Sequence, residues 1–175
     1  MNSFLIWSKY NQAMNERLFA ACAQLSVEQF NEDRGAFFGS VARTLNHILI
    51  ADVYWLRRFA CGETSTALLD ADGEPVRVTA SDQLVYADLG ALQQWRSKID
   101  ADIVACMERL EQEQADLSQI MTHRLADGSS TEFTWNKALC HWFNHQTHHR
   151  GQVTTLLTQM GSDVGLTDLL LMDLD

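Results

Sequence analysis

The sequence predicts an all-α protein, a four-helix bundle with one long crossover and a small β-hairpin before the last long helix. Among 175 residues there is a single proline, Pro75, the residue that most strongly interrupts helices. Four long stretches repeat apolar residues every three or four positions, which draws one apolar stripe along each helix. Residues 62–83 lose this period and contain the proline, so they are interpreted as an irregular crossover. We expect one domain over residues 1–175, because the chain has ordinary domain size.

The first helix is predicted from about residue 4 to residue 25. Its apolar positions are Phe4, Trp7, Tyr10, Met14, Leu18, Ala21 and Leu25. The second helix follows Ser40, whose hydroxyl can accept hydrogen bonds from free backbone N–H groups at a helix start. Gly62 is predicted to end it, because glycine readily adopts the left-handed conformation of a helix stop.

The third helix is predicted from about Asp88 to Gln112, with apolar residues again at helical spacing. Residues 120–135 then alternate around the pair Asp127-Gly128, which suits a tight turn with positive φ and therefore predicts a β-hairpin. The fourth helix is expected from about residue 135 to residue 160, with Gly161 as its stop.

Charge and composition exclude several classes of partner. The net charge of −10 repels phosphate backbones and anionic lipids, so we expect neither direct nucleic-acid binding nor membrane association. The chain lacks a signal-peptide pattern at its start and any run of eighteen apolar residues, and a cytoplasmic location is expected. No CxxC pair occurs, and the four cysteines are interpreted as reduced core thiols: Cys22, Cys61, Cys106 and Cys140.

Histidines gather in the predicted fourth helix, where residues 141–149 contain four of the six in the chain. Residues four apart lie on one helix face, so His141, His145 and His149 form a column, with His148 about 100° round from His149. Two such imidazoles can share a divalent ion, whereas a third ligand must come from a facing helix. The best candidate is His47, on the apolar face of the second helix. The sequence therefore predicts a metal site of three histidines: His47, His145 and His149.

These histidines also allow other interpretations. A lone histidine such as His47 is more often a hydrogen-bonded core residue than a ligand, but the pair in the fourth helix favours metal. The segment "HQTHH" resembles the zinc-protease motif HExxH, yet Gln146 replaces the general-base glutamate, so protease chemistry is not expected. His123, in the hairpin, is interpreted as structural or surface. Whether His141 or His148 assists the site stays open.

The segments "LNHILIADVYWLRR", "HWFNHQTHHRGQVTTLLTQMG" and "TDLLL" resemble the DinB family, part of the DinB/YfiT-like metalloenzyme superfamily. The resemblance implies an up-down-down-up bundle, commonly a homodimer, with a divalent metal held by three histidines. These carry over to His47, His145 and His149. Some members of the superfamily are thiol-dependent S-transferases or isomerases, so a low-molecular-weight thiol or another small molecule is an expected partner.

The remaining residues of these motifs carry further expectations. Arg150 is expected either to pair with an acid such as Asp168 or to be solvated. Gly151, which costs about 1 kcal/mol relative to alanine inside a helix, predicts the close approach of another backbone. Trp55 either walls the metal pocket or belongs to the core. Gln152 and Asn144 are candidates for contacts behind the ligands.

Three neutral histidines leave open positions on an ion, where a bound water or thiol would have a lowered pKa. The expected function is therefore that of a metal-dependent enzyme, either a thiol-dependent S-transferase or a small-molecule hydrolase. The alternative is a non-catalytic stress-response module that binds a ligand and uses its metal only for stability. Zinc or nickel is the expected ion, and iron or manganese also suits three imidazoles. No catalytic acid or base is assigned.

Overall fold

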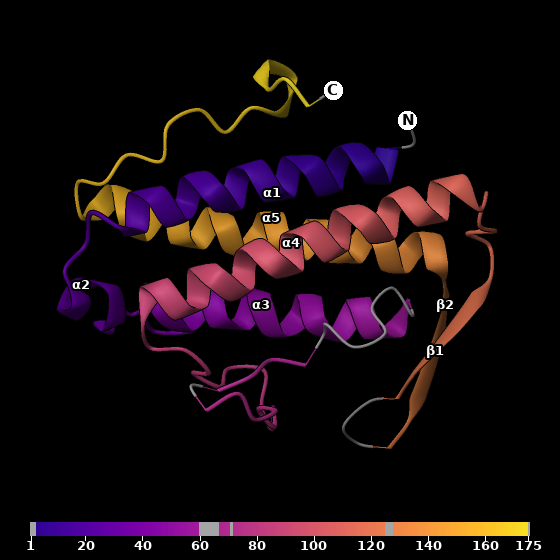
Figure 1. The fold of residues 1–175 in the computed structure, drawn as a ribbon, viewed down its shortest axis with the longest axis horizontal. Coiled ribbons are helices and arrows are strands. Elements are labelled where there is room, and N and C mark those ends of the chain that lie inside the picture. Colours follow the sequence, from indigo (N-terminus) through magenta and orange to yellow (C-terminus); the bar gives the residue numbers. More distant parts are fainter. Residues whose placement is uncertain (1–2, 60–66, 71, 125–127, 175) are drawn as a thin grey trace.

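A computed structural model describes residues 3–59, 67–70, 72–124 and 128–174. Its four long helices are α1 (Ser3–Cys22), α3 (Val41–Arg58), α4 (Leu89–Gln112) and α5 (Trp135–Gln159). Helices α1 and α5 run one way, and α3 and α4 the other, which confirms the up-down-down-up bundle (Figure 1). Both α1 and α3 pack against α4 and α5. Helix α5 therefore lies beside the helix that carries His47.

The helices begin at side chains that satisfy free backbone N–H groups. The Ser40 hydroxyl accepts from the Arg43 N–H at 3.2 Å, as predicted for the start of α3. A carboxylate oxygen of Asp88 accepts from the Ala91 N–H at 2.8 Å and starts α4. At the other end of α5, Gly161 has a φ of 81°, which confirms it as the helix stop. The proposed stop of α3, Gly62, lies outside the described residues.

Two elements differ from the predicted set. Helix α1 ends at Cys22 rather than near Leu25, and the short helix α2 (Val27–Asn31) follows it. In α2 the Ser26 hydroxyl accepts from the Gln29 N–H, while the Gln29 side chain accepts from the Ser26 N–H. Such reciprocal capping stabilises a helix too short to show an apolar period. The sequence pattern therefore did not predict it.

The hairpin is confirmed, with β1 (Ile120–Arg124) antiparallel to β2 (Ser130–Thr134). Gly128 has a φ of 85°, as expected for the turn, whereas Asp127 lies outside the described residues. Strand β2 leads directly into α5, because the Thr134 hydroxyl accepts from the Lys137 N–H and starts the helix. The hairpin thus extends from the N-terminal end of α5 (Figure 1).

The cysteine prediction was wrong in part. Cys22 is a free, buried thiol, as expected, and Cys140 is free but exposed. Cys106, which is 2% exposed, is disulfide-bonded. A disulfide requires two Cα atoms within about 4.4–6.8 Å, a tertiary proximity that spacing along the chain does not reveal. Cys61 lies outside the described residues.

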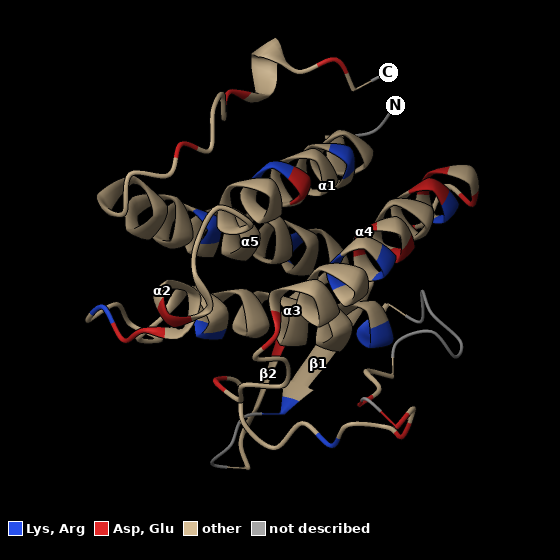
Figure 2. Ribbon diagram, turned by 60° about the vertical axis from the view of Figure 1, so that its left-hand side comes forward, with Lys and Arg blue, Asp and Glu red and all other residues tan. Residues whose placement is uncertain are grey.

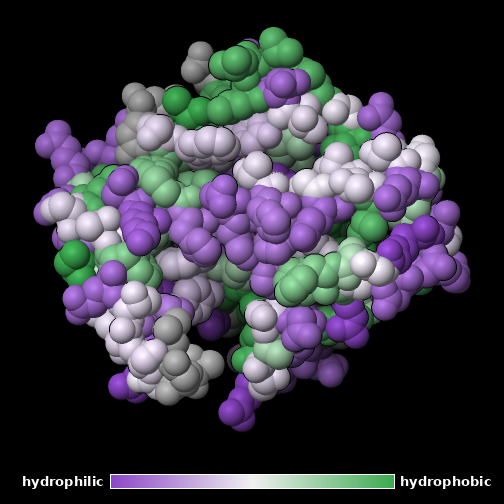
Figure 3. Space-filling model, turned by 180° about the vertical axis from the view of Figure 1, so that it is seen from behind, coloured by the Kyte–Doolittle hydropathy of each residue, from purple (hydrophilic) through white to green (hydrophobic). Residues whose placement is uncertain are grey.

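The C-terminal segment returns over α1 and ends in a short 3-10 helix, η1 (Leu169–Leu171) (Figure 1). Side chains of α1 donate hydrogen bonds to backbone carbonyls of this segment. The Tyr10 hydroxyl donates to the Thr167 carbonyl at 2.7 Å, and the Lys9 ammonium donates to the Leu174 carbonyl at 2.9 Å. Leu170 is 95% exposed. Figure 3 shows apolar surface at the top of the molecule, where the C-terminal segment lies in Figure 1.

Charged residues are spread over the surface with both signs mixed. Along α4, Lys and Arg are interspersed with Asp and Glu, whereas acidic residues predominate in the crossover and the C-terminal segment (Figure 2). Within the described residues, no helix combines the length and the apolar content that crossing a bilayer requires.

Candidate metal centre

The three predicted histidines come together where α3 faces α5. His47 of α3 and the pair His145 and His149 of α5 each offer one ligand atom, and these atoms all lie within 4.8 Å of one another. The Nε2 atoms of His47 and His145 are 2.9 Å apart. Tetrahedral zinc with Zn–N bonds of about 2.0–2.1 Å would hold two ligand nitrogens about 3.4 Å apart. The spacing of the cluster is therefore compatible with a metal site.

Two of the three rings are oriented by acceptors behind them. The Nδ1–H of His47 donates to the Ser81 carbonyl at 2.8 Å, and the Nδ1–H of His149 donates to the Gln152 side-chain oxygen at 2.8 Å. Since both partners accept, each Nδ1 carries the ring proton, and each Nε2 has a free lone pair. Such contacts are typical behind metal-binding histidines. Ser81, in the crossover, is a site residue that sequence analysis did not find, whereas Gln152 was a candidate.

His145 supplies the test of whether a cation fits. Its Nε2 faces the lone pair of His47 Nε2, and its Nδ1 is buried with no hydrogen-bond partner among the described residues. Burial, followed by the neighbouring histidines, lowers the pKa of His145 to about 3. Burial also lowers the pKa of His47 and His149. Three neutral imidazoles with converging lone pairs form a donor set that suits a divalent ion.

Aromatic rings enclose the centre. Phe38, from the turn before α3, stacks on His47 with ring centroids 4.1 Å apart and lies 5.4 Å from His149. His141, one turn before His145, is exposed, and its ring lies 5.9 Å from that of His145. His148 packs edge-on against His149 at 4.8 Å. Neither His141 nor His148 belongs to the group of converging ligand atoms.

The other two residues in question lie outside the histidine cluster. Trp55 is 7% exposed and belongs to the core, where it packs edge-on against His141 at 5.6 Å. His123 is half-buried, and its Nδ1 lies 2.6 Å from the Tyr54 hydroxyl. That hydrogen bond ties the hairpin to α3.

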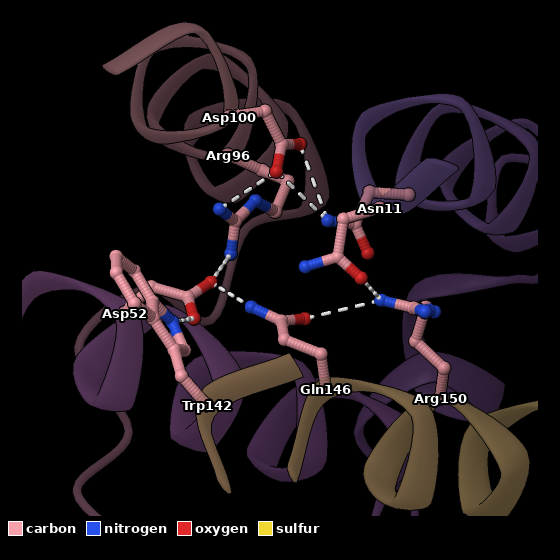
Figure 4. Close-up of polar contacts among 8 residues, drawn as sticks. Asn11, Asp52, Arg96, Asp100, Trp142, Gln146 and Arg150 are labelled. Atoms are coloured by element: carbon pink, nitrogen blue, oxygen red, sulfur yellow. Dashed lines mark hydrogen bonds and ion pairs between the residues drawn. The ribbon is translucent and has the colours of Figure 1, made fainter. Parts of the chain in front are cut away.

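A buried polar network lies beside the metal centre and was not predicted. Its centre is the Asp52 carboxylate, which is fully buried in α3. It accepts from the Arg96 guanidinium, from Trp142 Nε1 at 2.7 Å and from the Gln146 amide (Figure 4). Arg96 also pairs with Asp100 at 2.9 Å. Burial raises the pKa of Asp100 to about 6, although the Arg96 charge opposes that shift.

Gln146, at the position of the general-base glutamate of the zinc-protease motif, points into the buried network. Its amide nitrogen donates to Asp52 and its oxygen accepts from Arg150 at 3.3 Å, so both ends of the side chain are used inside the bundle (Figure 4). His145 and His149 precede Gln146 and Arg150 by one residue each. One side of α5 therefore serves the metal centre and the adjacent side serves the network.

The prediction for Arg150 was wrong, and the close approach predicted at Gly151 does not come from the described residues of this chain. Arg150 is 3% exposed and donates to the Asn11 side-chain oxygen of α1 (Figure 4), while Asp168 is exposed in the C-terminal segment. Burial lowers the pKa of Arg150 to about 10, so it stays charged at neutral pH. A Cβ at Gly151 would meet nothing within 4 Å among the residues that the structure describes. The sequence does not show which side of α5 faces α1.

The match to a known family covers the bundle and the centre together. The model of the DinB family matches residues 1–174. The chain belongs to the DinB family. It is also similar to Protein DinB of Bacillus subtilis (strain 168), with 22% identity over 160 residues, which cover 91% of this chain and 87% of the relative. The three histidines of this family member are thus part of a helical bundle that the family model matches almost from end to end.

Proposed function

We propose that this DinB-family protein is a metal-dependent enzyme acting on a small molecule, with a divalent ion held by His47, His145 and His149. The observation that supports it most is the donor set itself, three neutral imidazoles of which two have fixed tautomers. Structural zinc sites are usually closed by four protein ligands, whereas catalytic sites typically have three and keep one position open. Three converging histidines fit the catalytic pattern.

When bound, the ion would lower the pKa of a water or a thiol at its open position, as S-transfer or hydrolysis requires. The residues of the chain hold and shield that position. Ser81 and Gln152 keep the ligand rings oriented, and Phe38 covers His47 from one side. Beside His47 there is a cavity of about 350 Å³, lined also by Tyr54 and residues 78–81, and Figure 3 shows the surface hollowed between the hairpin and the crossover. We propose zinc or nickel as the ion, with iron or manganese as the alternatives.

The direct test is elemental analysis of protein purified without a histidine tag, followed by activity screening with several low-molecular-weight thiols and with small hydrolysable esters and amides. About one divalent ion per chain is expected. Protein that contains none after refolding or reconstitution with each of the four metals would contradict the proposal.

Removal of the metal separates an enzyme from a stabilised binding module. If the ion were structural, its binding free energy would be folding free energy, and chelation would unfold the bundle. We expect the apo-protein to keep its helical signal and to lose affinity for thiols, because four helices already bury a large apolar core. The measurement is thermal unfolding followed by circular dichroism, with and without chelator, paired with calorimetric titration of thiols. Collapse of the helical signal with no thiol binding to the holo-protein would support the rival function.

Gln152 should control metal affinity without touching the metal. Replacement by leucine removes the acceptor that holds His149 Nδ1–H, and loss of such an outer partner typically weakens metal binding by about 10–100-fold. Competition with a chromogenic chelator would measure the change. Gln152→Glu retains an acceptor and should preserve binding. Gln159→Leu, at an exposed position on the same helix, is the matched control and should have no effect.

We also propose that the chain forms a homodimer. The exposed apolar patch of the C-terminal segment, with Leu170 and Leu171, and the open space above Gly151 are surfaces that a second copy would cover. Light scattering should give about twice the chain mass of 19.8 kDa. A monomer at every concentration would remove this proposal and leave the metal site untouched.

A further inference from the structure

A second cavity lies one helical turn from the metal centre. It occupies about 290 Å³ and is lined by residues of the hairpin, of the start of α5 and of the end of α3. The described residues that line it are Trp55, His123, Phe133, Lys137, Ala138 and His141. Trp55 packs against Phe133 at 6.4 Å and against His141 at 5.6 Å. The walls are thus mainly aromatic, and the volume is close to the lower end of the range for small-ligand sites.

The polar groups of this cavity are aligned with the metal ligands. Lys137, His141 and His145 follow one another at intervals of four residues on α5, with a rise of about 6 Å per interval. Within the described part of the chain, the Lys137 ammonium has no ion pair and the His141 ring has no hydrogen bond. His123 differs, because its Nδ1 already contacts the Tyr54 hydroxyl. The cavity is therefore lined by an exposed cation and an exposed imidazole that form no ion pair or hydrogen bond with the described residues. Of the two, His141 lies nearer to the metal centre.

We propose that this cavity binds the ring of a small aromatic monoanion, an arylcarboxylate in the simplest case, and that it is the substrate pocket of the metal centre. The aromatic walls favour a flat apolar body, and Lys137 supplies the single positive charge that an anionic group needs. With the anion on Lys137, the other end of the molecule points past His141 toward His145. The binding of such a molecule does not depend on the proposed function. Only its role as a substrate rests on the proposed metal-dependent activity.

Binding can be measured without any assay of activity. Zinc-reconstituted protein would be titrated by calorimetry with phenylacetate, with the uncharged isostere phenylacetamide and with acetate, which lacks the ring. Phenylacetate should bind at least about tenfold more tightly than either analogue, a difference of about 1.4 kcal/mol. Lys137→Gln should bring phenylacetate down to the affinity of the amide, and Lys137→Arg should restore the preference. Lys98→Gln removes an exposed lysine that packs over Trp95 at 4.7 Å, and it should leave all three affinities unchanged.

Several outcomes would overturn the assignment. They are equal binding of phenylacetate and phenylacetamide, no binding of either, and an affinity insensitive to Lys137→Gln. A carboxylate can also coordinate zinc directly, so the titration would be repeated on chelated protein and on His145→Ala. Binding lost in both, yet unaffected by Lys137→Gln, would place the carboxylate on the metal instead. Binding retained in both, together with a wild-type protein that holds no metal, would leave the pocket established and the proposed metal function wrong.

Discussion

His145→Ala should lose nearly all bound metal. His145 is the ligand that faces His47 across the centre, with 2.9 Å between their Nε2 atoms, and it also lies one turn from His149 on α5. Without it the two remaining imidazoles come from different helices. We therefore expect a loss of affinity larger than the about 10–100-fold that follows removal of an outer partner. Elemental analysis after dialysis against metal-free buffer gives the content per chain.

A control for His145→Ala must show that loss of a histidine outside the cluster does not reduce the metal content. His123→Ala removes a half-buried histidine of the hairpin and should retain the full metal content, because His123 contacts Tyr54 instead of the cluster. His47→Ala and His149→Ala should behave like His145→Ala. Stoichiometric metal in His145→Ala would show that the ligand set is wrong, even if the protein binds a metal elsewhere.

Asp52→Asn should have the largest effect on stability, about 3–5 kcal/mol in the free energy of unfolding. The substitution keeps the size of the side chain and removes its charge, which leaves Arg96 buried with Asp100 as its remaining counter-ion. It also replaces an acceptor of three hydrogen bonds by an amide that can turn a donor toward Trp142 or Gln146. Urea denaturation of the wild type and the variant measures the difference.

Asp168→Asn is the matched control, because Asp168 is exposed and makes no capping hydrogen bond at the start of η1. It should change stability by less than about 0.5 kcal/mol. A similarly small effect of Asp52→Asn would show that the network is not energetically important. If Asp52→Asn folds, its metal affinity should also fall. The hydrogen bond between Gln146 and Asp52 fixes the orientation of α5 about its axis, and that orientation directs the neighbouring His145 toward the cluster.

The parts of the fold that sequence analysis predicted depend on local patterns. Ser40 and Gly161 mark helix ends by their own chemistry, and apolar spacing defines the helices between such marks. The histidine cluster was predicted for the same reason. Two of its histidines lie four residues apart on one helix, and the third lies on a strongly apolar face of another.

The parts that sequence analysis missed depend on which surfaces meet. The burial of Arg150 requires that α1 present Asn11 to it, and the disulfide of Cys106 requires proximity in space. The Ser81 carbonyl reaches His47 only because the crossover folds back over α3. A weak signal of the buried network was present in the sequence, since Asp52 lies among the apolar positions of its helix. One carboxylate on an apolar face indicates a buried partner but does not name it.

The distance along the chain between the clustered histidines affects the order of events during folding. His47 and His145 are 98 residues apart in the chain, and the two helices that carry them are separated by the crossover, α4 and the hairpin. Contacts between such distant segments require closure of a long loop, which is entropically unfavourable before the rest of the chain is ordered. During synthesis, His47 emerges well before the segment that completes the cluster. Metal insertion should therefore follow docking of the last helix, so that the fold assembles first and the ion enters a finished site.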